Sequence, residues 1–205
     1  MSSDDNKQQQ PVDHSRRRLL IGTTTALGAI GTAFVAVPFI KSWMPSAKAK
    51  AIGAPVEVDL RTIKPGQLIK VVWRGQTCGV MNRTPQLLEQ IDGHDEVLSD
   101  PESAVVEQQP SYAVNKFRSI KPEWLVLNMH CTHLGCIPQV LPEPGSYVWE
   151  ADWPGGFYCP CHKSKFDLAG RVFKSMPAPT NLIIPPYSFL DSNTVIIGVS
   201  SAGAM

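Results

Sequence analysis

The sequence has few of the features that would assign a class by composition alone. Its 205 residues carry a formal net charge of only +1, so no bulk electrostatic attraction to nucleic acid is expected. Five cysteines are too few for a disulfide-scaffolded fold. No long internal repeat is present, which argues against a solenoid or a propeller. The length leaves room for one modest domain and an appendage.

Two short stretches hold most of the side chains that could bind a metal. They are Cys131-Thr132-His133-Leu134-Gly135-Cys136 and Cys159-Pro160-Cys161-His162. Together they contain four of the five cysteines and two of the five histidines. Each stretch offers one Cys and one His to a shared centre and carries one further Cys. Together the two stretches can therefore supply two thiolates and two imidazoles as ligands, and two cysteines are left over.

A mononuclear zinc site with two Cys and two His is the obvious alternative. Zinc sites usually pair Cys with Cys and His with His, whereas each stretch here supplies one of each. The leftover Cys136 and Cys161 lie at matched places, which suggests a disulfide that clamps the two loops together. Such a bond persists in the oxidising surroundings of an exported protein. These features favour a site other than zinc.

The motif C-T-H-L-G-C followed by C-P-C-H resembles the Rieske [2Fe–2S] family. The resemblance implies one cluster per subunit, with Cys131 and Cys159 on one iron and His133 and His162 on the other. It also implies a disulfide between Cys136 and Cys161. In this family the two histidines are the catalytic contacts at the tip, and the second-loop histidine, here His162, meets the hydroxyl of the quinol.

Residues beside the second stretch match the family pattern in part. Ser164 matches a serine that hydrogen-bonds a bridging sulfide, and Leu134 matches an apolar residue that shields the cluster. Residues 177–179 match a proline-rich loop that buttresses it. Phe166 stands where many high-potential members have tyrosine, which implies a lower potential here because Phe cannot donate a hydrogen bond. Lys163 replaces the usual glycine and adds a cation near the tip.

The N-terminal third predicts an export signal, an anchor and a tether. Residues 1–18 are predicted to form a polar cytoplasmic tail, and its end, Ser15-Arg16-Arg17-Arg18-Leu19-Leu20, resembles a twin-arginine signal. Residues 19–41 are predicted to span the membrane, since Leu19 to Ile40 carry no charge and reach about 33 Å as a helix. The Ala-rich residues 42–55 are predicted to be a flexible tether. A cleaved signal peptide, with its cleavage site in residues 45–49, is the competing hypothesis.

The remaining residues, 56–205, predict a mostly β fold. Short alternating or β-branched runs such as Val56–Leu60 and Leu68–Trp73 are typical of strands, and a short helix is expected after Thr84. Further strands are expected at 124–127, 147–150, 156–158, 171–173 and 194–199. We therefore expect a small antiparallel Rieske-type domain whose cluster-binding part covers about residues 125–183.

Several reactive or aromatic residues are assigned no role in the site. Cys78 is expected to be a buried core thiol, and His130 is expected to face away from the centre that its neighbours share. His14 and His94 are expected to be solvated. Four tryptophans are expected to serve packing rather than electron transfer: Trp73, Trp124, Trp149 and Trp153.

With the anchor and tether, the resemblance extends to the iron–sulfur subunit of the bacterial cytochrome bc complex, a quinol–cytochrome c reductase. It implies electron transfer from quinol, expected to be ubiquinol, to a membrane-bound c-type cytochrome, with a contribution to proton translocation. Cytochrome b and that cytochrome are the expected partners, in a dimeric complex of the bacterial inner membrane with the cluster domain in the periplasm. The small subunit of a periplasmic oxidase, such as an arsenite oxidase, and a zinc-binding membrane-anchored module are the alternatives.

Overall fold

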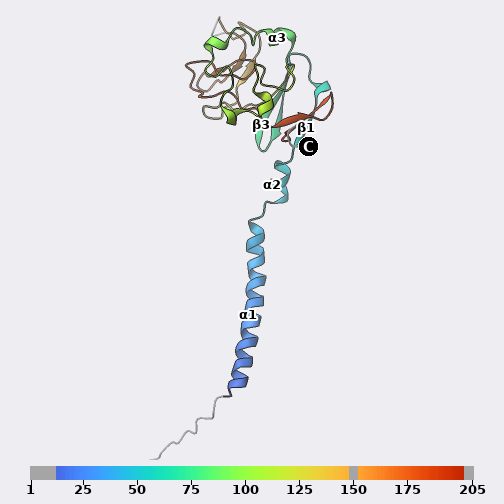
Figure 1. Cartoon of the computed structure of the whole chain (residues 1–205), viewed down its shortest axis with the longest axis vertical. Coiled ribbons are helices and arrows are strands. Elements are labelled where there is room, and N and C mark those ends of the chain that lie inside the picture. The colour runs from blue at the N-terminus through green and yellow to red at the C-terminus, as the bar shows by residue number, and fades with distance from the viewer. Residues whose placement is uncertain (1–12, 148–151, 201–205) are drawn as a thin grey trace, which may run out of the picture. The chain divides into compact units, whose positions relative to one another are not determined.

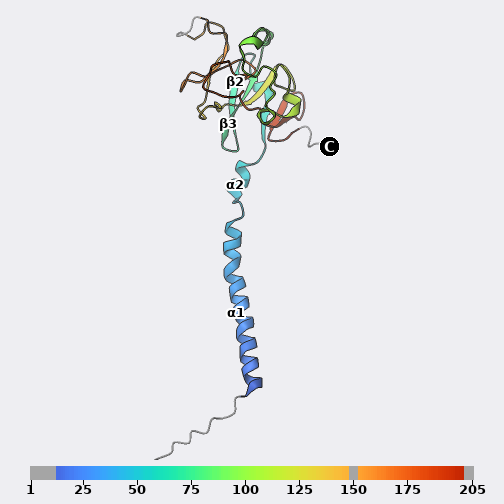
Figure 2. The same cartoon turned by 60° about the vertical axis from the view of Figure 1, so that its left-hand side comes forward.

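A computed structural model describes residues 13–147 and 152–200. The chain divides into two units, one ending at Lys50 and the other beginning at Ala51. The first unit is dominated by one long helix and the second by short antiparallel strands, as Figures 1 and 2 show from two directions. The predicted fold class, a small antiparallel β domain preceded by one apolar helix, is confirmed.

Helix α1 spans His14–Ser42 and is long and apolar enough to cross a membrane. It begins five residues before the predicted start at Leu19, because the Asp13 carboxylate caps it by accepting hydrogen bonds from the N–H groups of Ser15 and Arg16. The twin-arginine stretch therefore lies in the first turns of the helix, and residues 1–12 of the predicted tail lie outside the described residues.

The threonines of α1 bond to their own helix. The hydroxyl groups of Thr24, Thr25 and Thr32 each donate to the carbonyl oxygen four residues earlier, at 2.7–2.9 Å, and Thr23 reaches two carbonyls of the preceding turn. These side chains thus present few unpaired donors on the helix surface.

The predicted tether is partly helical. Helix α2 spans Ala47–Ile52, and the N–H of Lys50 donates to the carbonyl oxygen of Ser46 at 2.9 Å. The alanines of this segment are strong helix formers, which explains a helix where a flexible tether was expected. Six residues are too few to be a stable isolated helix, so α2 can melt at little cost.

Three antiparallel sheets of three strands each make up the second unit. The first sheet has the order β1 (Val56–Asp59), β9 (Thr194–Ile197), β8 (Tyr187–Phe189). The second has the order β2 (Leu68–Trp73), β3 (Gln76–Asn82), β4 (Trp124–Asn128). The third has the order β5 (Gln139–Leu141), β6 (Gly156–Tyr158), β7 (Lys165–Phe166).

Short helical elements join these strands. They are η1 (Leu60–Thr62), α3 (Pro85–Glu89), η2 (Asp95–Val97), η3 (Val106–Gln108) and η4 (Ser111–Ala113). Thr84 caps α3 as expected, its hydroxyl accepting from the N–H of Leu87. The strand expected at 171–173 is reduced to two isolated bridges, Phe166 with Val172 and Leu98 with Phe173. The strand expected at 147–150 lies mostly outside the described residues.

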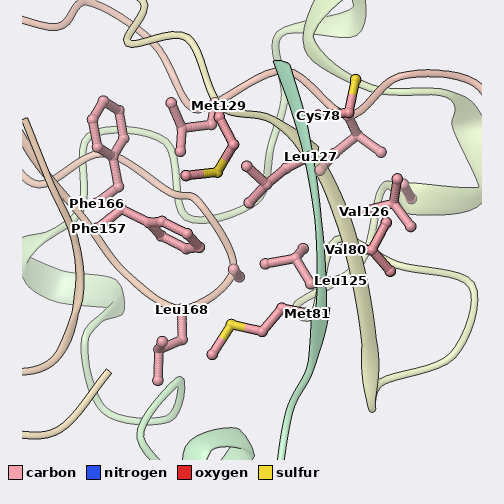
Figure 3. Close-up of a cluster of buried hydrophobic side chains, with 14 of the residues drawn as sticks. Cys78, Val80, Met81, Leu125, Val126, Leu127, Met129, Phe157, Phe166 and Leu168 are labelled. Carbon is pink, nitrogen blue, oxygen red and sulfur yellow. The ribbon is translucent and has the colours of Figure 1, made fainter. Parts of the chain in front are cut away.

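The core lies on both faces of the β2–β3–β4 sheet. On one face Met81, Leu125 and Leu127 point toward the aromatic rings of Phe157 and Phe166, which come from the third sheet (Figure 3). The opposite face carries Cys78, Val80 and Val126. Cys78 is fully buried, as predicted for a core thiol, and burial raises its pKa to about 11. Cys131 and Cys159 belong to the same buried cluster, so the site rests directly on the core.

Three buried arginines hold the loop that follows β7. The guanidinium group of Arg83 donates to the carbonyl oxygen of Leu168 at 3.1 Å, and that of Arg118 donates to the carbonyls of Ala169 and Gly170 at 3.3 Å. Burial lowers the pKa of Arg83 and of Arg118 to about 10, so both remain charged at neutral pH.

The third arginine forms a buried ion pair within the same loop. Arg171 Nε lies 2.7 Å from a carboxylate oxygen of Asp167, and both side chains are at most 2% exposed. The other oxygen of Asp167 accepts from the N–H groups of Ala169 and Arg171. This network fixes the backbone of the loop after β7.

Candidate [2Fe–2S] site

The first Cys/His stretch folds into a tight turn after β4. The N–H of Cys131 donates to the carbonyl oxygen of Cys136, and the N–H of Gly135 donates to the carbonyl oxygen of Cys131, both at 2.8 Å. Gly135 has a φ of +80°, in the left-handed region that glycine adopts without strain.

The second stretch repeats this turn between β6 and β7. The N–H of Cys159 donates to the carbonyl oxygen of Ser164 at 2.8 Å, and the N–H of Lys163 donates to the carbonyl oxygen of Cys159 at 2.9 Å. Lys163 takes the place of Gly135, with a φ of +62°. The two turns therefore present Cys131 and Cys159 in equivalent backbone positions.

A disulfide joins the two turns. Cys136 and Cys161 are bonded, with their Cα atoms 6.6 Å apart, as the sequence and the family resemblance both indicated. The Sγ atom of Cys159 lies within 4.8 Å of both disulfide sulfurs. The bond therefore clamps the turns beside one of the two free thiols of the site.

The four expected ligands lie in two pairs, since the thiol of Cys131 is beside that of Cys159 and the ring of His133 contacts that of His162. Cys131 and Cys159 are free thiols that are only 3% and 2% exposed. The rings of His133 and His162 make an edge contact, with 4.6 Å between their centroids. The Nδ1 atom of His133 is buried and has no hydrogen-bond partner among the described residues. His162 is exposed to solvent.

Hydrogen-bond donors surround the thiol of Cys131. The pKa of this thiol is raised, first because it is buried and also because Cys159 lies beside it, while hydrogen bonds from the backbone N–H of His133 and from the hydroxyl of Ser164 partly offset the rise. Such donors favour a deprotonated sulfur, which is the form that binds iron.

A third segment, residues 176–180, supports both turns. The N–H of Ala178 donates to the hydroxyl oxygen of Ser164 at 3.0 Å, and the hydroxyl of Thr132 donates to the carbonyl oxygen of Thr180 at 2.7 Å. Thr132 was not singled out in the sequence. Its place between Cys131 and His133 was a usable signal, because a hydroxyl within a ligand loop commonly bonds to a neighbouring backbone.

The residues that depart from the family pattern lie at the site. Phe166 is fully buried on β7, opposite Phe157 of β6. Lys163 is exposed next to His162. Leu134 is 70% exposed, so its side chain extends from the surface of the first turn.

Other residues considered in the sequence lie elsewhere. His130 accepts a hydrogen bond from the N–H of Thr77 through Nε2, which turns its ring toward β3 as expected. His14 is exposed at the start of α1. His94 is not fully solvated: it is half-buried, because its ring packs on the edge of Phe173 at 5.9 Å.

Three of the four tryptophans expected to serve packing lie in the described part of the β domain, and all three are buried or half-buried. Trp73 and Trp153 are buried, and Trp124 is half-buried in β4. The indole N–H of Trp153 donates to the carbonyl oxygen of Leu141 at 2.9 Å. Trp149 lies outside the described residues.

Comparisons with known proteins decide the family. A model of the Rieske [2Fe–2S] domain matches residues 90–188, and one of the ubiquinol–cytochrome c reductase Fe–S subunit TAT signal matches residues 6–46. The ubiquinol–cytochrome c reductase iron–sulfur subunit of Allochromatium vinosum is 49% identical over 95% of this chain and 94% of its own length. The chain belongs to this family. The Blastochloris viridis subunit is 41% identical, over 92% and 95% of the two chains.

A chain of a solved hyperthermophilic respiratory Complex III is 26% identical, over 87% of this chain and 98% of that one, with a TM-score of 0.47. Family membership confirms the resemblance, the [2Fe–2S] cofactor and the role of electron-transfer subunit in a cytochrome bc complex. With helix α1, it also makes the protein a membrane-anchored subunit.

The residues present fit the cluster of the Rieske subunit family. Two thiols are buried and free, one of them accepts hydrogen bonds, and a buried imidazole nitrogen has no partner among the described residues. A buried polar atom without a partner is costly unless a ligand satisfies it. An iron at this position would satisfy Nδ1 of His133 and leave its Nε2 free to face outward.

Proposed function

We propose that Cys131 and Cys159 hold one iron of the cluster and that His133 and His162 hold the other. The observation that carries this assignment is the unpartnered, buried Nδ1 of His133, next to the ring of His162 and in a site with two free thiols. Replacing two thiolates by neutral imidazoles gives Rieske centres potentials of about −150 to +300 mV.

The exposed ring of His162 makes it the contact for the quinol. Held by these four residues, a [2Fe–2S] cluster would supply one-electron redox chemistry next to the bound quinol. The imidazole of His162 orients the quinol hydroxyl by accepting its hydrogen bond and takes up the proton.

The membrane anchor and the β domain together indicate the partners. Residues 19–41 anchor the subunit, with the arginines before them on the cytoplasmic side of the bacterial inner membrane by the positive-inside rule. The β domain then lies in the periplasm, where it meets cytochrome b and a membrane-bound c-type cytochrome. The complex is dimeric and its substrate is ubiquinol.

The domain must travel between these two partners. Residues 42–55 link the anchor to the β domain, and α2 is short enough to melt and re-form. We expect the domain to swing on this link, taking an electron at cytochrome b and delivering it to the c-type cytochrome.

Electron paramagnetic resonance with redox titration on membranes tests the ligand assignment. The wild-type chain should show a reduced Rieske signal, and Cys131→Ser, Cys159→Ser, His133→Ala and His162→Ala should each abolish it. The matched control Cys78→Ala, at a buried free thiol outside the site, should retain the signal. A signal that survives loss of one of the four ligands would refute the assignment, and zinc without sulfide in the purified protein would favour the zinc module.

A further inference from the structure

The two cluster turns differ at one position where the backbone demands the same conformation. Gly135 and Lys163 donate equivalent hydrogen bonds, to the carbonyl oxygens of Cys131 and Cys159, and both have positive φ angles, +80° and +62°. Glycine adopts this conformation freely, whereas a lysine is strained in it. Strained residues of this kind are concentrated at functional sites, where the strained side chain contributes to the mechanism.

The charge of the tip makes the lysine conspicuous. The tip consists of residues 131–137, 159–166 and 176–180, and these contain two lysines and no Asp or Glu. Lys163 is exposed, and Lys165 is half-buried on β7. The exposed ammonium group of Lys163 therefore places a positive charge next to the exposed ring of His162.

The same surface has an apolar part that a partner must cover. Leu134 is 70% exposed and Ile137 is 42% exposed on the first turn. Transient redox complexes have small interfaces in which charge complementarity supplies the rate of encounter and the specificity. The Cys136–Cys161 disulfide joins the turn that carries these apolar side chains to the turn that carries Lys163. Such a surface fits a partner that offers both an apolar contact and a carboxylate.

We propose that Lys163 is a docking residue that pairs with an acidic side chain on the c-type cytochrome. This inference rests on the proposed function and adds a specificity determinant to it. The quinol is a less suitable partner for the ammonium group of Lys163, because the quinol is uncharged. Its site must also exclude water, and an unpaired ammonium group is costly in such a site. On the surface of a cytochrome the pair stays partly hydrated and steers association without a large desolvation cost.

The test uses the intact cytochrome bc complex with four variants: Lys163→Gln, Lys163→Arg, Lys163→Gly and the control Lys70→Gln, which removes an exposed lysine from β2. Rapid-mixing or flash kinetics measure cytochrome reduction by the cluster at ionic strengths of about 0.01 M and about 1 M. At low salt, Lys163→Gln and Lys163→Gly should be slower by about three- to five-fold, and the deficit should vanish at high salt. Lys163→Arg and Lys70→Gln should match the wild type.

Two further readouts separate docking from other roles. The midpoint potential of Lys163→Gln should change too little to explain its slower rate. The rate of electron transfer from quinol to the cluster should be unchanged. Thermal loss of the cluster signal in Lys163→Gly should shift upward by about 1–3 °C because backbone strain is relieved. If Lys163→Gly is more stable than the wild type and also slower at low salt, then Lys163 contributes to docking at a cost in stability.

Several results would overturn the inference. They are an unchanged rate for Lys163→Gln at low salt, a deficit independent of salt, a deficit explained by the potential alone, and a deficit confined to the quinol step. Absence of the Rieske signal from the unmodified complex would instead overturn the proposed function, and this inference with it.

Discussion

The backbone N–H of Ala178 donates to the hydroxyl oxygen of Ser164 at 3.0 Å, and Ser164 is fully buried. Because the oxygen already accepts a hydrogen bond, the hydroxyl proton is directed toward the thiol of Cys131 and the cluster site. The proline-rich segment thereby orients a donor as well as supporting the turns.

Ser164→Ala should lower the midpoint potential. The hydroxyl donor stabilises the reduced, more negative form of the cluster, and each 1.4 kcal/mol of such preference corresponds to about 59 mV for one electron. We expect a decrease of about 60 mV, measured by redox titration of the paramagnetic resonance signal. Ser188→Ala, which removes a hydroxyl from β8, is the control; a fall of equal size there would contradict the role of Ser164.

Phe166→Tyr should raise the midpoint potential. Phe166 is fully buried beside the second turn, so a hydroxyl added to its ring can donate to a sulfur of the site. Phe166→Leu changes the packing without adding a donor and should leave the potential near that of the wild type. An unchanged or lower midpoint in the tyrosine variant would rule out this explanation.

Removing the disulfide should destabilise the β domain. The bond closes a loop with a sequence separation of 25, for which the chain-entropy relation gives about 3.5 kcal/mol. Cys136→Ser combined with Cys161→Ser should therefore lose its cluster signal at lower temperature or denaturant concentration than the wild type. Cys78→Ala, which removes a thiol and keeps the bond, should retain most of the stability; equal loss in both would argue against the clamp.

Prolines in the link should slow turnover. Ala49→Pro together with Ala51→Pro prevents α2 from re-forming and stiffens the segment, so the domain should reach its two partners more slowly. We expect a several-fold lower rate of quinol-dependent cytochrome c reduction with an unchanged midpoint potential. Normal turnover in this variant would refute the swing.

Asp167→Asn should be among the most damaging single changes outside the ligands. Its carboxylate pairs with the buried Arg171 at 2.7 Å, and removing one partner of a buried pair costs about 3–5 kcal/mol. Denaturant unfolding should show this loss. Asp59→Asn, in the exposed pair of Asp59 with Arg61, should show no measurable change. Comparable losses in the two variants would contradict a special role for the buried pair.

Much of the site could be predicted because its signals are local. Cys131, His133, Cys159 and His162 lie within two stretches of a few residues, and the one further cysteine in each stretch already suggested the disulfide that the structure contains. That the four ligands divide between two irons remains a prediction.

Other features depend on contacts that no local pattern shows. The bonds of Arg83 and Arg118 to the loop after β7 join residues more than fifty positions apart. Strands β5, β7 and β8 have only two or three residues each, too short for an alternating pattern. His94 was expected to be solvated because its sequence neighbours are polar, but a bridge between Leu98 and Phe173 places the ring of Phe173 against it.

The internal bonds of the threonines in α1 bear on the energy of inserting the anchor into lipid. A hydroxyl group transferred without a partner costs about 1–3 kcal/mol, so Thr23, Thr24, Thr25 and Thr32 would together impose a large barrier if each were unpaired. Since each bonds to a carbonyl of its own helix, the segment enters the bilayer as if it were more apolar than its composition implies. Replacement of these threonines by valine should therefore change membrane retention little.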